Sequence, residues 1–257
     1  MGNKRRAKPR HSTASRRRRA TSRGAWSSVK VIEGPPIGPD LVTASLDEVL
    51  AAIDTVPADL DWPALADRIV PAFQRVRPYP PGQPEPMRIL VPPGLSVGFA
   101  IDVGPAFLIV DAGMIERWRL TPAEVLARAL DNLDRRMAGV GPDDLIDGSI
   151  EGQPIRILQS STGCASTYVL LPTSLRRILG SEPQQVIAPM RNLLISLPLE
   201  ADREFTAWLF GEFAAQDPNC LAPAAFVIRE GGLSVEPLGA AAIRSKAPAG
   251  CSGSPVM

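Results

Sequence analysis

The chain has 257 residues, 45% of them hydrophobic, which is enough to bury the core of a globular domain without disulfides. Three widely spaced cysteines and a single histidine, His11 near the N-terminus, exclude a disulfide framework, a zinc ribbon and a histidine-based catalytic triad in the body of the chain. No apolar run approaches the roughly 18 residues that span a bilayer, so we expect a cytoplasmic protein without a transmembrane segment.

Residues 1–30 form a strongly basic segment in a chain whose formal charge is only +1. They are rich in Arg, Ser and Ala and lack apolar periodicity, so we expect a disordered tail. Ten of the 28 Lys and Arg residues lie before Ala25, which leaves 18 basic against 27 acidic residues in the remainder, a net charge of −9. The ten are Lys4, Arg5, Arg6, Lys8, Arg10, Arg16, Arg17, Arg18, Arg19 and Arg23.

This basic tail has four alternative roles. Ten positive charges on a flexible segment can neutralise the phosphates of nucleic acid, and an anionic lipid surface attracts them for the same reason. A charge run of this kind can instead be a solvated tail that aids solubility, or it can fold back on the acidic body.

Residues 41–76 predict a helical lead-in to the body of the protein. Ser45-Leu46-Asp47-Glu48 has the spacing of a capping box, and a second helix is predicted to begin near Pro63 and to run through Phe73. Residues 77–86 contain five prolines, which predicts an extended connector between this lead-in and the main domain.

The main domain, residues 87–238, is predicted to open with three strands. Gly104-Pro105 between the second and third suits a type II′ hairpin, because Gly takes the positive φ and Pro the negative one. We therefore expect an antiparallel pair here. The predicted strands are Met87–Val91, Val97–Val103 and Ala106–Asp111.

The clearest helix signal follows this hairpin. Thr121-Pro122-Ala123-Glu124 is a capping box with Pro at the first helical position. Apolar residues from Leu126 to Met137 then recur at helical spacing, and Gly139 and Gly141 end the helix.

The remaining segments mix hairpins with helices without regular alternation, which favours an α+β fold of antiparallel β-hairpins packed with several amphipathic helices. Residues 239–257 are rich in Ala, Gly, Ser and Pro and predict a second disordered tail. The segment Cys164–Leu171 favours neither helix nor strand. The predicted strands are Ile155–Gln159, Gln185–Ala188, Leu193–Ser196, Phe226–Arg229 and Leu233–Glu236, and the predicted helices are Ser174–Leu179 and Glu200–Ala215.

The stretch Val97–Met137, with Asp102 at a strand end and an Ala-x-x-Asn-Leu pattern at residues 129–133, is similar to the YtpQ-like bacterial proteins. That family is known mainly as a domain of unknown function. Cys164–Pro172 and Val186–Ser196 resemble it too, although the acid of its Pro-x-Arg-Asp segment is Asn192 here. The resemblance spans roughly residues 87–238 and implies a fold and a boundary but no activity.

Five polar residues form a candidate cluster. Asp102 and Asp111 bracket the predicted hairpin, so we expect them near the same end of the sheet, where Arg191 could complete a cluster of carboxylates and a guanidinium. Such a cluster is either a buried ion pair that holds strands in register or the site of a histidine-free hydrolytic or metal-assisted enzyme. Asn132 needs a polar partner because Asn is a poor helix former, and Asn192 belongs to the same group.

Two further motifs have competing interpretations. Asp143-Asp144-Leu145-Ile146-Asp147 matches the D-D-x-x-D pattern that holds magnesium and diphosphate on a helix face, but Pro142 and Gly148 flank it and favour a polar loop. Cys164 lies in a turn rich in Ser and Thr where a thiolate could be activated, yet no histidine is present to act as its base, which favours a small buried residue.

The sequence thus predicts a binding or interaction protein without an assigned cofactor, metal site or catalytic residue. Its partners would be nucleic acid or another anionic surface at the tail, and a further protein. The alternative is the enzyme built on Asp102, Asp111 and Arg191.

Overall fold

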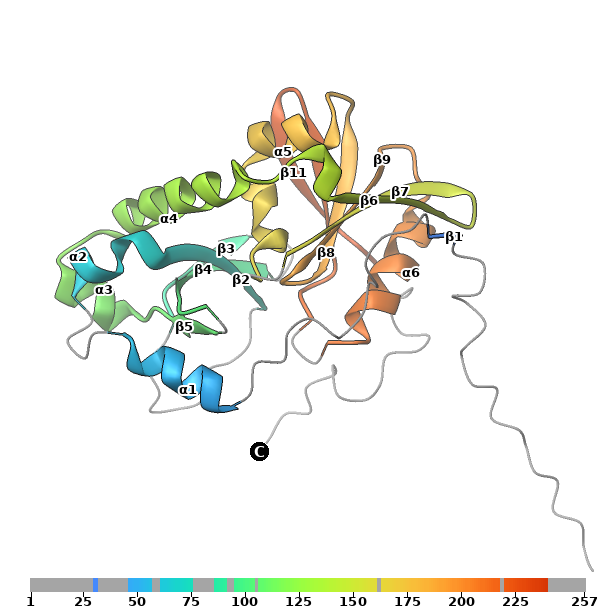
Figure 1. Ribbon diagram of the computed structural model, residues 1–257. Coiled ribbons are helices and arrows are strands. Elements are labelled where there is room, and N and C mark those ends of the chain that lie inside the picture. The colour runs from blue at the N-terminus through green and yellow to red at the C-terminus, as the bar shows by residue number, and fades with distance from the viewer. Residues whose placement is uncertain are drawn as a thin grey trace, which may run out of the picture.

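The computed structural model describes residues 30–31, 46–56, 61–75, 86–91, 95–104, 106–160, 163–217 and 220–239. Nearly all of both predicted tails, the proline-rich connector before Pro86, and Ser45 of the first capping box lie outside these residues. The described part consists of helices and antiparallel sheets, so the predicted α+β class is confirmed (Figure 1).

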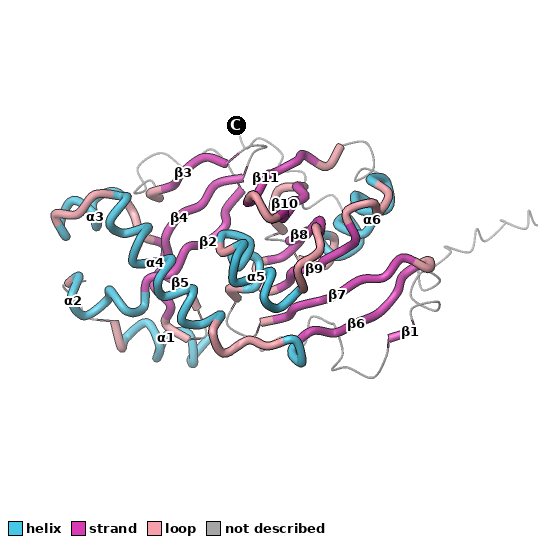
Figure 2. Tube along the Cα trace, turned by 90° about the horizontal axis from the view of Figure 1, so that it is seen from above, coloured by secondary structure: helices cyan, strands magenta, loops and turns pink. Residues whose placement is uncertain are grey.

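A seven-stranded sheet forms the larger half of the molecule, and all of its neighbouring strands are antiparallel (Figure 2). Three hairpins of consecutive strands build it, and two of them, β6 with β7 and β8 with β9, lie side by side through the β7–β9 pair. In spatial order the strands are β1 (Lys30–Val31), β6 (Leu145–Ile150), β7 (Gln153–Gln159), β9 (Leu193–Pro198), β8 (Gln184–Met190), β10 (Ala224–Arg229) and β11 (Gly232–Pro237).

The central strands of this sheet are covered on both faces. Ile187 and Ile195 pack with helix α6 (Arg203–Ala214) on one face. Val186 and Leu194 pack on the other face with the 3-10 helix η4 (Ala165–Leu170) and helix α5 (Pro172–Leu179). Because both faces are buried, β8 and β9 have continuous apolar runs instead of an alternating pattern.

A smaller sheet contains β2 (Ile69–Arg75), β4 (Leu95–Asp102) and β3 (Arg88–Val91), in that order, with β5 (Phe107–Ile109) also paired to β4. The β4–β5 pair is the predicted hairpin, and Gly104 in its turn has the expected positive φ of 89°. That prediction is confirmed.

The predicted lead-in needs correction. Helix α1 (Leu46–Asp54) is present, but α2 (Trp62–Leu65) is a single turn that passes through the 3-10 helix η2 (Ala66–Arg68) into strand β2. Seven residue pairs join β2 to β4, so tertiary pairing prevails over the apparent helical spacing of Leu65, Ile69 and Phe73. Residues 41–76 are therefore not a separate helical unit, because β2 belongs to the same sheet as β3 and β4.

The helix predicted after residue 120 is α4 (Pro122–Met137), preceded by the short helix α3 (Ala112–Trp118). Its capping box forms as expected, since Glu124 Oε2 accepts hydrogen bonds from Thr121 N at 2.7 Å and Thr121 Oγ1 at 2.8 Å. The buried face differs slightly from the predicted one, with Val125 and Ala129 fully buried and Leu126 and Leu130 only partly so.

One of the three buried hydrophobic clusters joins the two sheets. The ring of Phe73 on β2 stacks on that of Phe226 on β10, with 5.5 Å between ring centroids. Val70 of the small sheet, Leu133 of α4 and Val186 of the large sheet belong to the same buried cluster. In the described part of the chain, no helix is long and apolar enough to cross a membrane.

Candidate functional site

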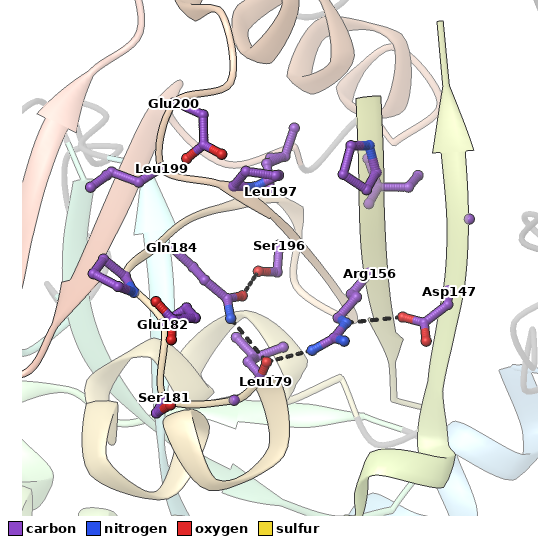
Figure 3. A pocket seen from close by; sticks show the side chains of 16 residues that line it. Asp147, Arg156, Leu179, Ser181, Glu182, Gln184, Ser196, Leu197, Leu199 and Glu200 are labelled. Carbon is purple, nitrogen blue, oxygen red and sulfur yellow. Dashed lines mark hydrogen bonds and ion pairs between the residues drawn. The ribbon is translucent and has the colours of Figure 1, made fainter. Parts of the chain in front are cut away.

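A cleft of about 790 Å³ lies against the large sheet, beside the C-terminal end of α5 (Figure 3). Its lining comes from β6, β7 and the end of β9, from the α5–β8 segment Leu179–Gln184, and from the turn that follows β9. This volume is within the range of sites that hold a small ligand or a short segment of chain.

A row of polar side chains crosses the sheet at the bottom of the cleft. Asp147 of β6 is directly opposite Arg156 of β7, which is opposite Ser196 of β9, so all three side chains project from one face. Gln184 of the next strand, β8, completes the row by accepting a short hydrogen bond from Ser196 Oγ. Arg156 Nε donates to Asp147 Oδ1 at 3.0 Å.

This row also caps helix α5, whose last carbonyl groups have no partner within the helix. The carbonyl oxygen of Leu179 accepts hydrogen bonds from Arg156 Nη1 and, at 2.9 Å, from Gln184 Nε2. Gly180 permits the tight exit from the helix, because its φ of 104° is unfavourable for any other residue. The Arg156 charge is thus balanced by Asp147 and by the negative end of the helix.

The rim of the cleft has unpaired negative charge. Glu182 and Glu200 are exposed, and neither forms an ion pair with a residue in the described ranges. Leu179, Leu197 and Leu199 supply apolar wall between the charged groups. Such a cleft suits a ligand that combines positive charge with small or apolar groups, and it disfavours phosphate.

A second polar cluster lies inside the protein, between the small sheet and η4. Asp102 Oδ2 is 2.5 Å from Arg136 Nη1 of α4, and the same nitrogen is 3.7 Å from Cys164 Sγ. Burial, with the nearby Cys164, raises the pKa of the Tyr168 hydroxyl. This cluster joins α4 to β4 and η4. Cys164 is only 1% exposed, so its thiol is not accessible to a ligand.

The two carboxylates of the predicted site do not lie together. Asp102 faces Phe107 across the hairpin. Asp111 follows Phe107 by four residues, which at 3.3 Å per residue of extended chain is about 13 Å from Phe107. Asp111 is the N-cap of α3, where its Oδ1 accepts a hydrogen bond from Met114 N at 2.8 Å. The expectation that both residues lie at the same end of the sheet is therefore wrong, because the register places them at opposite ends of the β4–β5 pair.

Arg191 and Asn192 lie elsewhere, in the turn between β8 and β9 of the large sheet. Their carbonyl oxygens accept hydrogen bonds from Ser166 N at 3.0 Å and Ser160 N at 2.9 Å. Burial lowers the pKa of Arg191, and the nearby charge of Asp217 opposes this shift.

Within the described ranges, no hydrogen bond or ion pair joins the guanidinium of Arg191 to Asp102 or Asp111. Asp102 has Arg136 as its ionic partner instead.

Asn132 has the partners that its place in a helix required. Its side chain is buried, and Nδ2 donates to the carbonyl oxygens of Ala66 and Ile69, each at 2.7 Å. Its role is to hold α4 against the junction between η2 and β2.

The D-D-x-x-D segment is not on one helix, because Asp143 and Asp144 belong to the 3-10 helix η3 (Pro142–Asp144) while Asp147 is on β6. Among the described residues, no group of three or more His, Cys, Asp or Glu side chains is placed to hold a metal ion.

Sequence reasoning did not identify Arg156, Gln184 or Ser196. A weak signal exists in β7, where Arg156 stands between Ile155 and Ile157 and must therefore face away from them. Nothing in the sequence relates it to Gln184 or Ser196, because the three residues meet only through strand pairing.

Comparison with known proteins found no relative of this chain. No protein-family model matches the chain, and no curated protein or solved structure matches it either.

Proposed function

We propose that this protein is a binding protein whose arginine-rich tail contacts the phosphates of nucleic acid while its folded body excludes them. The observation that carries the proposal is the separation of charge: ten basic residues precede Ala25, and the remainder has a net charge of −9. The free carboxylates of Glu182 and Glu200 at the cleft add to this negative body. Phosphate contact therefore belongs to the tail.

The composition of the tail indicates how it would bind. No aromatic residue lies among its arginines, so stacking on single-stranded bases contributes little. Arg and Lys side chains without base-reading neighbours contact the backbone, which gives affinity without sequence preference. A duplex, with its higher density of phosphates, is the expected target.

The geometry supports the alternative enzyme less well. Asp102 is paired with Arg136, Asp111 caps α3, and Arg191 lies on the other sheet. Asp102 and Asp111 each have a structural role, and a hydrolytic site would require all three residues to converge on one substrate. We also propose, from the similarity in sequence, that the chain is related to the YtpQ-like family. This relationship does not assign an activity to the protein.

The test compares two full-length variants with the same loss of charge. Arg17→Gln with Arg18→Gln alters the tail, and Arg117→Gln with Arg229→Gln removes two exposed charges from the body. Affinity for a short DNA duplex is measured at several salt concentrations by fluorescence anisotropy. For the tail variant, the slope of log affinity against log salt should become shallower by about 2. The body variant should keep the wild-type slope.

Two outcomes would contradict the proposal. Equal slopes for the tail variant and the wild-type protein would show that the tail does not contact the duplex. Binding to vesicles of anionic phospholipid without measurable binding to the duplex would assign the tail to a membrane surface instead.

A further inference from the structure

We propose that residues 16–23 of the tail dock in the cleft of their own chain, which makes the cleft an intramolecular site for a cationic segment. Polyanions would then release the tail. The docking rests on the cleft and on the attachment, length and charge of the tail, while the release rests on the function proposed above.

The point at which the tail joins the body favours this occupant. Strand β1 pairs with β6 so that Lys30 is opposite Ser149 and Val31 is opposite Gly148. Gly148 and its neighbour Asp147 line the cleft. The tail is therefore anchored on the strand next to the one that forms a wall of the site (Figure 2).

The chain is also long enough. Strand β7, which contains Arg156, is two strands from β1, a distance of about 10 Å. Arg23 precedes Lys30 by seven positions and Arg16 by fourteen, which allows extended spans of up to about 24 Å and about 48 Å. The whole of residues 16–23 can therefore reach the cleft, and the tether maintains a local concentration of about millimolar.

The charged and apolar groups of the cleft also favour residues 16–23 as the occupant. Arg156 is already occupied by Asp147 and the end of α5, so the charges left for a ligand are the carboxylates of Glu182 and Glu200. Arginine forms paired hydrogen bonds with carboxylates, and its apolar stem can lie on the leucine walls. In residues 16–23, arginines flank the small residues Ala20, Thr21 and Ser22.

The consequence is competition. A docked tail is withheld from phosphates, so the apparent affinity for a polyanion equals the intrinsic affinity multiplied by the fraction of molecules whose tail is free. Removing the cleft carboxylates should therefore strengthen polyanion binding more than removing the same charge elsewhere.

The first experiment measures docking in the full chain without any polyanion. Amide hydrogen exchange of the segments 181–184 and 197–200 is compared between the wild-type protein and a tail variant with Arg16, Arg17, Arg18 and Arg19 each replaced by Gln. We expect exchange to be about threefold faster in the tail variant, which corresponds to a tail docked about two thirds of the time. Equal exchange in the two proteins would overturn the docking.

The cleft variant Glu182→Gln with Glu200→Gln tests whether these carboxylates hold the tail. In this background, replacing the four arginines should no longer change the exchange of either segment. The control is Glu116→Gln with Glu230→Gln, two exposed residues outside the cleft, in which the arginine replacements should retain their effect. The same arginine effect in cleft and control backgrounds would place the tail elsewhere.

The second experiment addresses release. The cleft variant should bind a short DNA duplex about threefold more tightly than the control variant, which has the same net charge. Equal affinities of the cleft and control variants for the duplex would overturn the release of the tail by polyanions. The docking would still stand if the tail variant exchanges its amide hydrogens faster than the wild-type protein. Failure of all proteins to bind the duplex would contradict the proposed function without bearing on the exchange result.

Discussion

Asn132 illustrates how one buried polar side chain decides where a helix lies. It is 2% exposed, and its amide nitrogen binds two backbone carbonyl groups at the point where η2 becomes β2. Buried polar groups are tolerated in proteins when their hydrogen bonds are made. The sequence shows that this Asn needs a partner, but the partners, Ala66 and Ile69, are more than sixty residues away in the chain.

The substitution Asn132→Ala should lower the free energy of unfolding by about 2 kcal/mol. It removes the two hydrogen bonds that Nδ2 donates to backbone carbonyl groups and the one that Oδ1 accepts from Arg135, and it leaves the carbonyl groups without this donor. Urea unfolding measures the change. Asp131→Ala, at an exposed position of the same helix, is the control and should change stability by less than about 0.5 kcal/mol. Similar losses for the two variants would show that the Asn132 hydrogen bonds do not stabilise the fold.

Asp102 shows the limit of reasoning from single residues. Its position at a strand end marks it as a site candidate, yet its partner is Arg136, which the sequence analysis did not single out. Both side chains are partly buried, and pairing offsets the cost of burying their charges. The predicted partner, Arg191, lies in the turn between β8 and β9 of the large sheet.

Helix α4 is the element that local sequence specifies best, and β2 is the one it specifies worst. The start of α4 depends on contacts between residues three positions apart, which the capping box supplies. Strand β2 depends on pairing with β4, and the isolated segment has apolar residues at a spacing that suits a helix equally well. The segment by itself therefore predicts a helix, because its partner strand β4 is not adjacent to it in the sequence.

The capping box predicts a pH dependence of stability. Hydrogen bonds from the backbone and hydroxyl of Thr121 hold the pKa of Glu124 below its ordinary value. A lowered pKa in the folded state means that the charged carboxylate stabilises the fold above the pKa of the unfolded chain, and that this contribution disappears as pH falls through the folded pKa. Glu124→Gln should therefore be less stable than the wild-type protein at neutral pH, and the difference should diminish in acid.

Thermal unfolding between neutral and acidic pH measures this difference. Glu116→Gln changes an exposed side chain of α3 and leaves the backbone C-cap hydrogen bond of that helix in place. Its difference in stability from the wild-type protein should not diminish comparably in acid. A difference in stability between Glu124→Gln and the wild-type protein that stays constant across the pH range would contradict the assigned role of the carboxylate.

At the scale of the whole molecule, the described chain has two sheets that are joined by one of its three buried clusters. The buried cluster that contains Val70, Leu133 and Val186 extends from the small sheet across α4 to the large sheet. Phe73 and Phe226 stack at the centre of this contact. The predicted boundary at residues 77–86 therefore does not divide independent folding units, and we expect the sheets to unfold together.

Phe73→Leu and Phe226→Leu test the link between the sheets. Each should destabilise the protein by less than the 3–5 kcal/mol typical of Phe→Ala, and the pair should show a coupling energy of about 1 kcal/mol in a double-mutant cycle. Urea unfolding followed by fluorescence and by circular dichroism should give one coincident transition.

The control cycle replaces Phe99, which lies in the separate cluster around α3, together with Phe226. These two changes should add to within about 0.5 kcal/mol. Additivity of Phe73 and Phe226, or two separated transitions, would show that the sheets are independent.

The cleft could not have been foreseen from the sequence. Asp147, Arg156, Ser196 and Gln184 come from four different strands, and they form a row only because the register aligns them. A shift of one residue in any of these strands would turn its side chain to the opposite face. Register depends on pairing between distant segments, which no local pattern reveals.

The α+β class, the β4–β5 hairpin, the capped helix α4 and the separation of charge all follow from the sequence, because they depend on composition or on contacts within a few residues. The conversion of residues 69–75 from predicted helix to strand, the separation of Asp102 from Asp111, and the assembly of the acidic cleft were decided by tertiary structure. Long-range pairing buries apolar surface and satisfies backbone hydrogen bonds together, and that combined gain outweighs weak local preferences.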